Sequence, residues 1–255
     1  MNHPIHTEYG TVRVSQVQTE HQLKITALLD WMQDVAYTHS NKLESFSTDV
    51  LLRRNLSWAL MRMFILVFNL PHLGQDLTLS TYPSSLSRYF AFRDYELRDM
   101  QNNPMVLATS TWAVFDLSKR RIIKTPADFF QGFAPPKSAN LEFKRSKIPP
   151  LRQFQKSQTV YIRENDLDLN GHVNHSCMAD WVLLGLTPDW GSNSFLKELD
   201  IVFRSECTLQ NQAVSTLSAI WGEASHGSEL NHLHSIKDLK HEQEFARAVS
   251  TWTRS

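Results

Sequence analysis

The chain has 255 residues, of which 42% are hydrophobic and 20% are charged, and its 26 basic residues balance its 26 acidic ones. This length supports one large domain or two of about 120 residues, each with a core of its own. A net charge of zero argues against nucleic acid or an anionic membrane as the main partner. Two cysteines, Cys177 and Cys207, are too few for a disulfide framework, which favours a reducing compartment.

The sequence contains no pattern that predicts export or membrane insertion. The first residues, MNHPIHTEYG, lack the charged and apolar segments of a signal peptide. The longest apolar run, WALMRMFILVF, contains Arg62 and is too short to cross a bilayer. We therefore expect a cytoplasmic protein.

The first half reads as a strand, a helix and then more strands. Alternation over Gly10 to Val17 predicts a strand, and apolar residues three and four positions apart predict an amphipathic helix from Ile25 to about Lys42. The turn signal DMQNNP separates the last two of four further strand-like segments. These segments are residues 57–68, 76–82, 88–98 and 105–116.

The second half repeats this order after a proline-rich stretch. Prolines break helices and remove ladder donors, so we read residues 135–156 as a linker over the surface. A strand is expected at 158–164, and Val173, Cys177, Trp181 and Leu184 mark one face of a helix. Four more strands are expected at 196–207, 213–221, 229–236 and 244–253.

Two short identities indicate an internal duplication. The pair Asp30-Trp31 recurs as Asp180-Trp181, and the segment ATSTW at 108–112 recurs as AVSTW at 248–252. Both matches occur in the same order, with agreeing helix and strand patterns. The sequence therefore predicts an α+β protein in which a helix wrapped by an antiparallel sheet occurs twice.

The segment DLDLNGHVNH places acid, amide and imidazole groups at alternate positions just before the second helix. If the segment is extended, Asp168, Asn170 and His172 point to the same side. Such groups can orient water, donate hydrogen bonds and transfer protons near neutral pH. The alternative is that Asp168 and Asn170 only form a turn and cap the helix. Asn174 is the better candidate for the cap, which would free Asn170 for chemistry.

Glu206 and Cys207 are adjacent candidates, and strand alternation allows only one of them to face a given pocket. Leu199, Ile201 and Phe203 form an apolar face whose parity includes Cys207. An unbroken strand thus favours Glu206 as the chemical group and Cys207 as a core residue. A β-bulge would reverse this assignment, so Cys207 stays the alternative nucleophile.

Other residues carry weaker signals. Asp168, His172 and His175 do not match a known metal-ligand spacing, so no metal is expected. The sequence has no GxSxG, P-loop or GxGxxG motif. Four histidines near the C-terminus lie in a polar region and are expected to be exposed; they are His226, His232, His234 and His241. A basic run comprises Lys119, Arg120, Arg121 and Lys124, and such runs are most often solvated surface.

DLDLNGHVNH followed by Trp181, together with FRSEC at 203–207, resembles the signature of the acyl-acyl carrier protein (ACP) thioesterases of plants and bacteria. In the first half, SWALMRMFILVFNLP, RYFAFRDYELRD and TSTWAVFDLSKRRIIKTP resemble the same family. The resemblance implies a double hotdog fold. It implies an acyl-chain-binding hotdog at 1–134, a linker at 135–156 and a catalytic hotdog at 157–255.

The resemblance also implies the reaction and the partner. The family hydrolyses acyl-ACP to free fatty acid and holo-ACP, which ends fatty acid synthesis, and it uses no cofactor. Both a Cys-His-Asn scheme and a carboxylate scheme have been proposed for it, and parity favours the carboxylate of Glu206. An acidic carrier protein would give the basic run 119–124 a docking role. Aligning the Asp-Trp pairs sets Gln18, Glu20 and Gln22 opposite the trio, so only the second half looks catalytic.

Two alternatives stay open at this point. One is another hotdog enzyme, either an acyl-CoA thioesterase or a dehydratase-like enzyme, and the other is a non-catalytic acyl-chain binding protein. The sequence does not settle acyl-chain length or saturation, whether Glu206 acts as base or nucleophile, or whether two chains form a homodimer.

Overall fold

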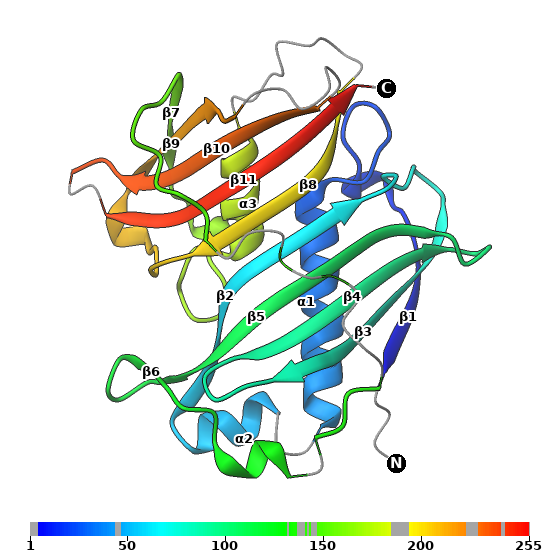
Figure 1. Ribbon diagram of the computed structural model, residues 1–255, viewed down its shortest axis with the longest axis vertical. Coiled ribbons are helices and arrows are strands. Elements are labelled where there is room, and N and C mark those ends of the chain that lie inside the picture. The colour runs from blue at the N-terminus through cyan, green and yellow to red at the C-terminus, as the bar shows by residue number, and fades with distance from the viewer. Residues whose placement is uncertain are drawn as a thin grey trace. The chain divides into compact units, whose positions relative to one another are not determined.

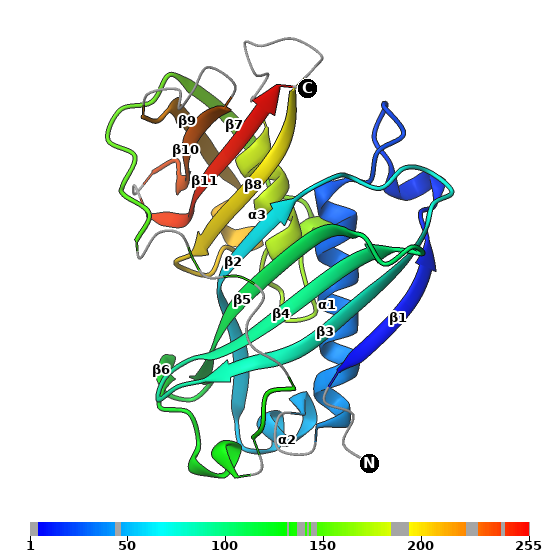
Figure 2. The ribbon, with the colours of Figure 1, turned by 45° about the vertical axis from the view of Figure 1, so that its right-hand side comes forward.

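The structure is a computed structural model, and it describes residues 5–43, 47–131, 133–136, 141, 143, 147–184, 194–222, 229–240 and 243–254. The chain divides into two compact units, Met1–Glu142 and Phe143–Ser255. Each unit is an antiparallel sheet with a helix packed on one of its faces, as Figures 1 and 2 show for α1 and α3. Each unit is described below by itself.

In the first unit the sheet order is β1-β3-β4-β5-β2, and the short β6 pairs with the end of β5. A short helix, α2, precedes β2, and neither α2 nor β6 is evident from the sequence pattern. The elements are β1 His6–Thr11, α1 Ile25–Lys42, α2 Thr48–Arg53, β2 Leu56–Val67, β3 Asp76–Leu86, β4 Ala91–Asp99, β5 Pro104–Asp116 and β6 Arg121–Ile123.

Helix α1 forms where the apolar spacing predicts it, from Ile25 to Lys42. Its buried residues recur every three or four positions, which is the period of one helix face. They are Leu28, Leu29, Met32, Val35, Ala36 and His39. This face packs on β3 and β1, so the core of the first unit lies between the helix and the sheet.

In the second unit the sheet order is β7-β9-β10-β11-β8, which repeats the first order strand for strand. Helix α3 packs on β10, β9 and β11. The elements are β7 Lys156–Tyr161, α3 His175–Leu183, β8 Ser194–Phe203, β9 Ala213–Ile220, β10 Glu229–Asp238 and β11 Glu244–Arg254. The predicted duplication is therefore confirmed, and the protein is a double hotdog of the α+β class.

The recurring ATSTW and AVSTW segments occupy the same place in β5 and β11. The indole Nε1 of Trp112 donates to Ser110 Oγ over 2.7 Å, and that of Trp252 donates to Ser250 Oγ over 2.9 Å. Each serine lies two residues before its tryptophan, on the same side of the strand. The sequence identity thus preserves one side-chain hydrogen bond in both units.

Three expectations about element limits were wrong. The strand expected from Gly10 to Val17 ends at Thr11, and a 3-10 turn follows at Val14–Gln16. The strand expected at 196–207 ends at Phe203. Ile148 and Leu151, placed in a surface linker, are buried in a cluster with residues of β10 and β11. The limits of the two hotdogs and of the linker stay a prediction.

The expectation that the C-terminal histidines are exposed was also wrong for two of them. His232 and His234 are buried on β10, and His226 and His241 lie outside the described residues. His234 Nε2 lies 2.8 Å from Ser250 Oγ. Burial, and then the neighbouring His232, lower the pKa of His234 from 6.5 to about 3. A polar local sequence did not imply exposure, because the strand carries these side chains into the core.

The low pKa of His234 predicts a pH-dependent stability. Below pH 6.5 the unfolded chain binds a proton at His234, whereas the folded chain does so only near pH 3. The free energy of unfolding therefore decreases as the pH is lowered. The contribution lost between pH 7 and pH 5 is about 2 kcal/mol. Urea unfolding of the wild type and of His234→Phe measures it. The variant should lose less stability than the wild type over this interval, and an equal loss would contradict the assignment.

Candidate active site

Asp168, Asn170 and His172 lie on a tight turn just before α3. The N–H of Asp168 donates to the His172 carbonyl over 2.7 Å, and the N–H of Gly171 donates to the Asp168 carbonyl over 3.0 Å. Gly171 has a φ of +77°, a conformation that a glycine adopts without steric cost. The expectation of an extended segment was therefore wrong, and strand alternation does not determine where the three side chains point.

The carboxylate of Asp168 holds this turn. Its Oδ1 accepts the backbone N–H of Asn170 over 2.8 Å and that of His172 over 3.1 Å. This is the turn geometry that the alternative interpretation of Asp168 requires. Among the described residues, no donor is hydrogen-bonded to its Oδ2. Asn170 lies exposed on the turn. Asp168 thus fixes the backbone of His172, whatever further role it has.

Helix α3 is capped as expected, because Asn174 Oδ1 accepts the N–H of Ser176 over 3.2 Å. The turn is also tied to the segment after β8. The N–H of Val173 donates to the Cys207 carbonyl over 2.7 Å, and His172 forms an antiparallel bridge with Thr208. These bonds bring two distant parts of the chain together, the turn before α3 and the residues around Glu206.

His172 and Glu206 form the pair that this arrangement creates. His172 Nε2 lies 3.5 Å from Glu206 Oε2, and the two side chains are 31% and 39% exposed. A carboxylate beside an imidazole can accept, hold and return a proton, and partial exposure gives water access to both groups. Of the five candidates, these two are the ones that the structure brings into direct side-chain contact.

Cys207 is buried, with 0% of its surface exposed. Burial, followed by the charge of Asp238, raises the pKa of its thiol to about 12. The thiol is therefore protonated at neutral pH and a poor nucleophile. The parity argument assumed a strand through Cys207, which was wrong because β8 ends at Phe203. The side assignment holds nonetheless, since Cys207 lies in the core and Glu206 at the surface.

The first unit contains the same turn without these groups. Gln18 N–H donates to the Gln22 carbonyl over 2.9 Å, and Leu23 N–H donates to the Pro71 carbonyl over 2.8 Å. Pro71 therefore corresponds to Cys207, and the buried Leu70 takes the position of Glu206. This last correspondence is not visible in sequence identity, because the linking segments differ in length. At the two positions that hold His172 and Glu206 in the second unit, the first unit has Gln22 and Leu70.

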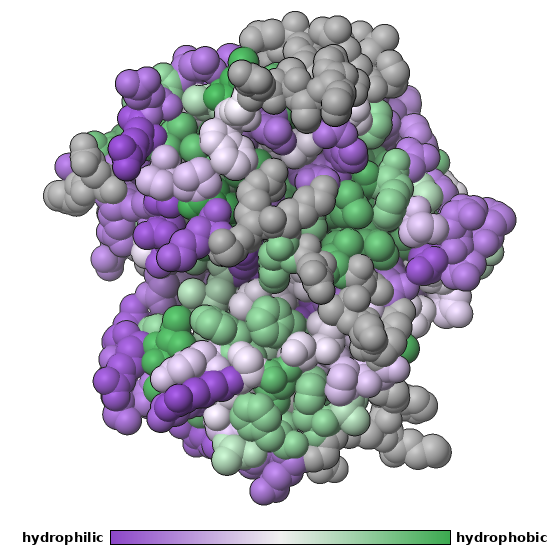
Figure 3. Space-filling model, viewed as in Figure 1, coloured by the Kyte–Doolittle hydropathy of each residue, from purple (hydrophilic) through white to green (hydrophobic). Residues whose placement is uncertain are grey.

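The basic run forms an exposed hairpin between β5 and β6. Lys119, Arg120, Arg121 and Lys124 are all exposed, and Lys119 Nζ lies 3.4 Å from Asp116 Oδ2. Figure 3 shows hydrophilic residues at the left margin of the first unit, where Figure 1 places β6. The surface is thus available to an acidic partner.

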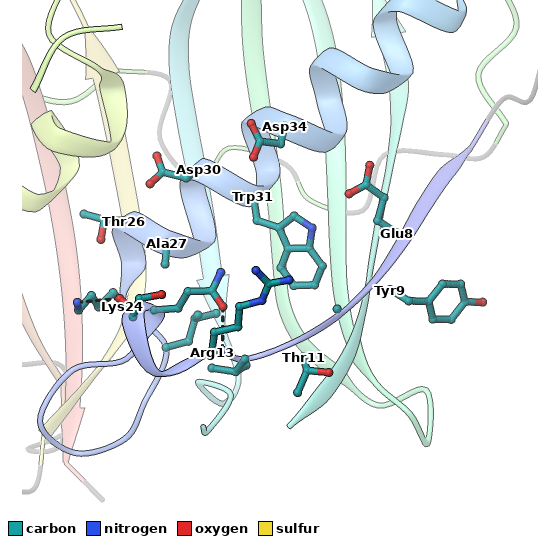
Figure 4. A pocket seen from close by; sticks show the side chains of 15 residues that line it. Glu8, Tyr9, Thr11, Arg13, Lys24, Thr26, Ala27, Asp30, Trp31 and Asp34 are labelled. Atoms are coloured by element: carbon teal, nitrogen blue, oxygen red, sulfur yellow. Dashed lines mark hydrogen bonds between the residues drawn. The ribbon is translucent and has the colours of Figure 1, made fainter. Parts of the chain in front are cut away.

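Two further features bear on the site. Among the described residues, no group of three histidine, cysteine or acidic side chains is placed to hold a metal ion, and no helix is long and apolar enough to cross a membrane. A groove of about 520 Å³ lies on the first unit between β1 and α1 (Figure 4). None of the candidate catalytic residues lines it.

Models of known protein families match both halves of the chain. The model of the acyl-ACP thioesterase N-terminal domain matches residues 4–133, and that of the C-terminal domain matches residues 151–254. The chain belongs to the acyl-ACP thioesterase family. The candidate pair lies in the part that matches the C-terminal domain.

Individual relatives agree with this family. A chloroplastic dodecanoyl-ACP hydrolase of Cinnamomum camphora is 23% identical over 94% of this chain and 65% of its own length. The chloroplastic oleoyl-ACP thioesterase 1 of Arabidopsis thaliana is 25% identical over 97% of this chain and 75% of its own. The chain thus spans about two thirds to three quarters of these acyl-ACP thioesterases.

Solved structures have the same fold. The 12:0-ACP thioesterase from Umbellularia californica superposes with a TM-score of 0.85 at 21% identity, over 100% of this chain and 96% of that one. A putative oleoyl thioesterase from Lactobacillus plantarum also gives 0.85, at 17% identity, over 98% and 96%. Both similarities extend over the two units of the chain.

Proposed function

We propose that this acyl-ACP thioesterase family member hydrolyses the thioester of acyl-ACP and releases a free fatty acid and holo-ACP without a cofactor. The observation that carries the proposal is the His172–Glu206 pair, 3.5 Å apart and partly exposed, in the C-terminal domain of the family. The first unit keeps the same backbone bonds with Gln22 and Leu70 at the matching positions, so the framework does not need the pair. The names of the relatives supply the substrate class.

In the proposed reaction Glu206 acts on the water that attacks the thioester. The carboxylate takes a proton from water, the water oxygen bonds to the carbonyl carbon, and the carbon–sulfur bond breaks. The proton then returns to the leaving thiolate through the pair. His172 orients the carboxylate and shares the proton, and Asp168 holds the backbone of His172. Direct attack by Glu206 would use the same pair and give an anhydride that water opens.

The first unit is proposed to hold the acyl chain. Its helix and sheet enclose an apolar core that includes Leu28, Leu29 and Met32. Its turn has Gln22 and Leu70 where the second unit has His172 and Glu206, which is why binding, and not catalysis, is proposed for it. The proposed division is 1–134 for binding, 135–156 for the linker and 157–255 for catalysis. We further propose a cytoplasmic location, whereas the plant relatives are named as chloroplastic.

Turnover tests the proposed function. The protein should release free thiol and fatty acid from an acyl-ACP chain-length series, and more slowly from the matching acyl-CoA series because CoA lacks the carrier surface. Faster turnover of acyl-CoA would favour the acyl-CoA thioesterase. Tight acyl binding with no thiol release would favour the non-catalytic binder.

The His172–Glu206 pair, and Asp168 that holds the backbone of His172, predict the phenotypes of two variants. His172→Ala and Asp168→Asn should each lower kcat on acyl-ACP roughly a hundredfold, as expected for groups that position and transfer protons. Asp168→Asn keeps an oxygen that can accept the two backbone N–H groups and removes only the negative charge, so its thermal unfolding should match the wild type and its loss of kcat would come from the charge. Asn174→Asp, which keeps the helix cap, is the control and should stay active. Near wild-type kcat in folded His172→Ala would reject the catalytic role.

The basic hairpin predicts a loss specific to the carrier. Exposed charges opposite an acidic partner mainly change the rate of association. Replacing Lys119, Arg120 and Arg121 together by glutamine should raise KM for acyl-ACP roughly tenfold. Activity on a short acyl thioester of N-acetylcysteamine should be unchanged, and added salt should shrink the difference. An equal loss on both substrates, or no loss on either, would contradict docking at the hairpin.

A further inference from the structure

The groove on the first unit has features that the proposed hydrolysis does not use. Its volume is about 520 Å³, and it follows β1 and the outward side of α1. Figure 4 shows the Trp31 indole reaching from α1 toward β1, with Glu8, Asp30 and Asp34 around it. A pocket of this size accommodates a side chain together with part of its backbone.

Gly10 allows the indole to lie against β1. A Cβ added at Gly10 would lie 2.9 Å from Cζ2 of Trp31, closer than non-bonded carbons approach. Any other residue at this position would therefore move the ring. The glycine and the tryptophan together form one wall of the groove, and the exposed Tyr9 precedes the glycine on the same strand.

Strand β1 is also an edge of its sheet. It pairs with β3 over His6–Thr11, and among the described residues no strand pairs with its other side. Alternate residues of an edge strand direct N–H and C=O groups outward, where an extended segment can pair with them. The groove therefore runs beside a free set of main-chain hydrogen-bonding groups.

The charged side chains near the indole are of both signs. Asp30 and Asp34 lie on α1 and Glu8 lies on β1, whereas Arg13 and Lys24 are basic. Partial burial, then Asp30 and Glu8, raise the pKa of Asp34, so the three acidic groups affect one another. Glu8 Oε1 lies 3.0 Å from His6 Nε2. On the basic side, Lys24 Nζ donates to the Ser15 carbonyl over 3.2 Å.

Arg13 completes the charged groups at the groove, and Figure 4 places its guanidinium beside Trp31. Its side chain is exposed.

The second unit gives an internal comparison. Its matching positions, by the order of β7 and α3, hold Gln158 for Glu8, Val160 for Gly10 and Leu184 for Asp34. Trp181, which matches Trp31, is buried there. The same scaffold thus has a half-buried tryptophan at a groove with three carboxylates in one unit and a buried tryptophan in the other. The contact between Gly10 and Trp31 is therefore not repeated in the second unit, where Val160 takes the position of the glycine.

We propose that an extended peptide segment of a partner protein adds to the edge of β1 and directs a lysine or arginine side chain into the groove beside Trp31, Asp30 and Asp34. Main-chain hydrogen bonds to β1 would provide affinity, as in other cases of strand addition. The indole face and the carboxylates would select the cation. An acidic carrier protein does not suit this surface, so the proposed partner is distinct from the substrate.

A binding experiment on the full chain tests the proposal. The probe is a fluorescein-labelled, end-blocked peptide of sequence Thr-Val-Lys-Val-Thr, followed by fluorescence polarisation. It should bind the wild type, and the double variant Asp30→Asn with Asp34→Asn should weaken binding roughly tenfold. Asp180→Asn, the matching change in the second unit, should leave binding unchanged. Gly10→Val should abolish it, with thermal unfolding as the check that the variant folds.

Three results would overturn the proposal. The first is no binding of the lysine peptide at millimolar protein, and the second is equal binding when glutamate replaces its lysine. The third is undiminished binding after N-methylation of alternate peptide amides, since strand addition needs those groups. None of these readouts depends on thioester hydrolysis, so failure of the proposed function leaves this test intact.

Discussion

The hydrogen bond from the Val173 N–H to the Cys207 carbonyl, 2.7 Å long, sets the geometry on which the proposed chemistry depends. It joins the turn before α3 to the residues that follow β8, which are far apart in sequence. Asp168 then fixes the backbone of His172 through a carboxylate hydrogen bond. With both contacts in place, His172 and Glu206 face each other at 3.5 Å. A site held by backbone bonds of this kind needs little reorganisation when substrate arrives.

The duplication explains why the two units can differ in role. Leu23 makes the equivalent bond to Pro71 in the first unit, so the framework there is kept without Glu206 or His172. The first unit also has an apolar core and a surface groove at Gly10 and Trp31. We propose that one scaffold carries the reactive groups in one copy and binds ligands in the other. Function here depends on a few side chains placed on a repeated backbone.

Features set by local periodicity could be predicted from the sequence. The apolar spacing of α1 gave its limits correctly, and the ATSTW and AVSTW segments predicted the duplication. The cap at Asn174 also followed from its place before the helix. These features depend on residues close together in the chain, for which propensity and pattern are informative.

Features set by contacts between distant segments could not be predicted. The turn at Asp168 arises from side-chain to backbone bonds that compete with an extended strand. His234 was expected to be exposed because the surrounding sequence is polar. Its burial comes from its place in the sheet, which the local sequence does not reveal. The wall formed by Gly10 and Trp31 joins a strand to a helix and leaves no pattern in the sequence.

The central claim is that the carboxylate of Glu206, and not the thiol of Cys207, carries out the chemistry. Turnover of acyl-ACP by Glu206→Gln and by Cys207→Ala, each checked for folding, tests it most directly. The buried thiol, with its pKa raised to about 12, predicts that Cys207→Ala keeps most of its activity, and that Glu206→Gln loses nearly all of it because an amide cannot take a proton from water. An active Glu206→Gln with an inactive, folded Cys207→Ala would contradict the account.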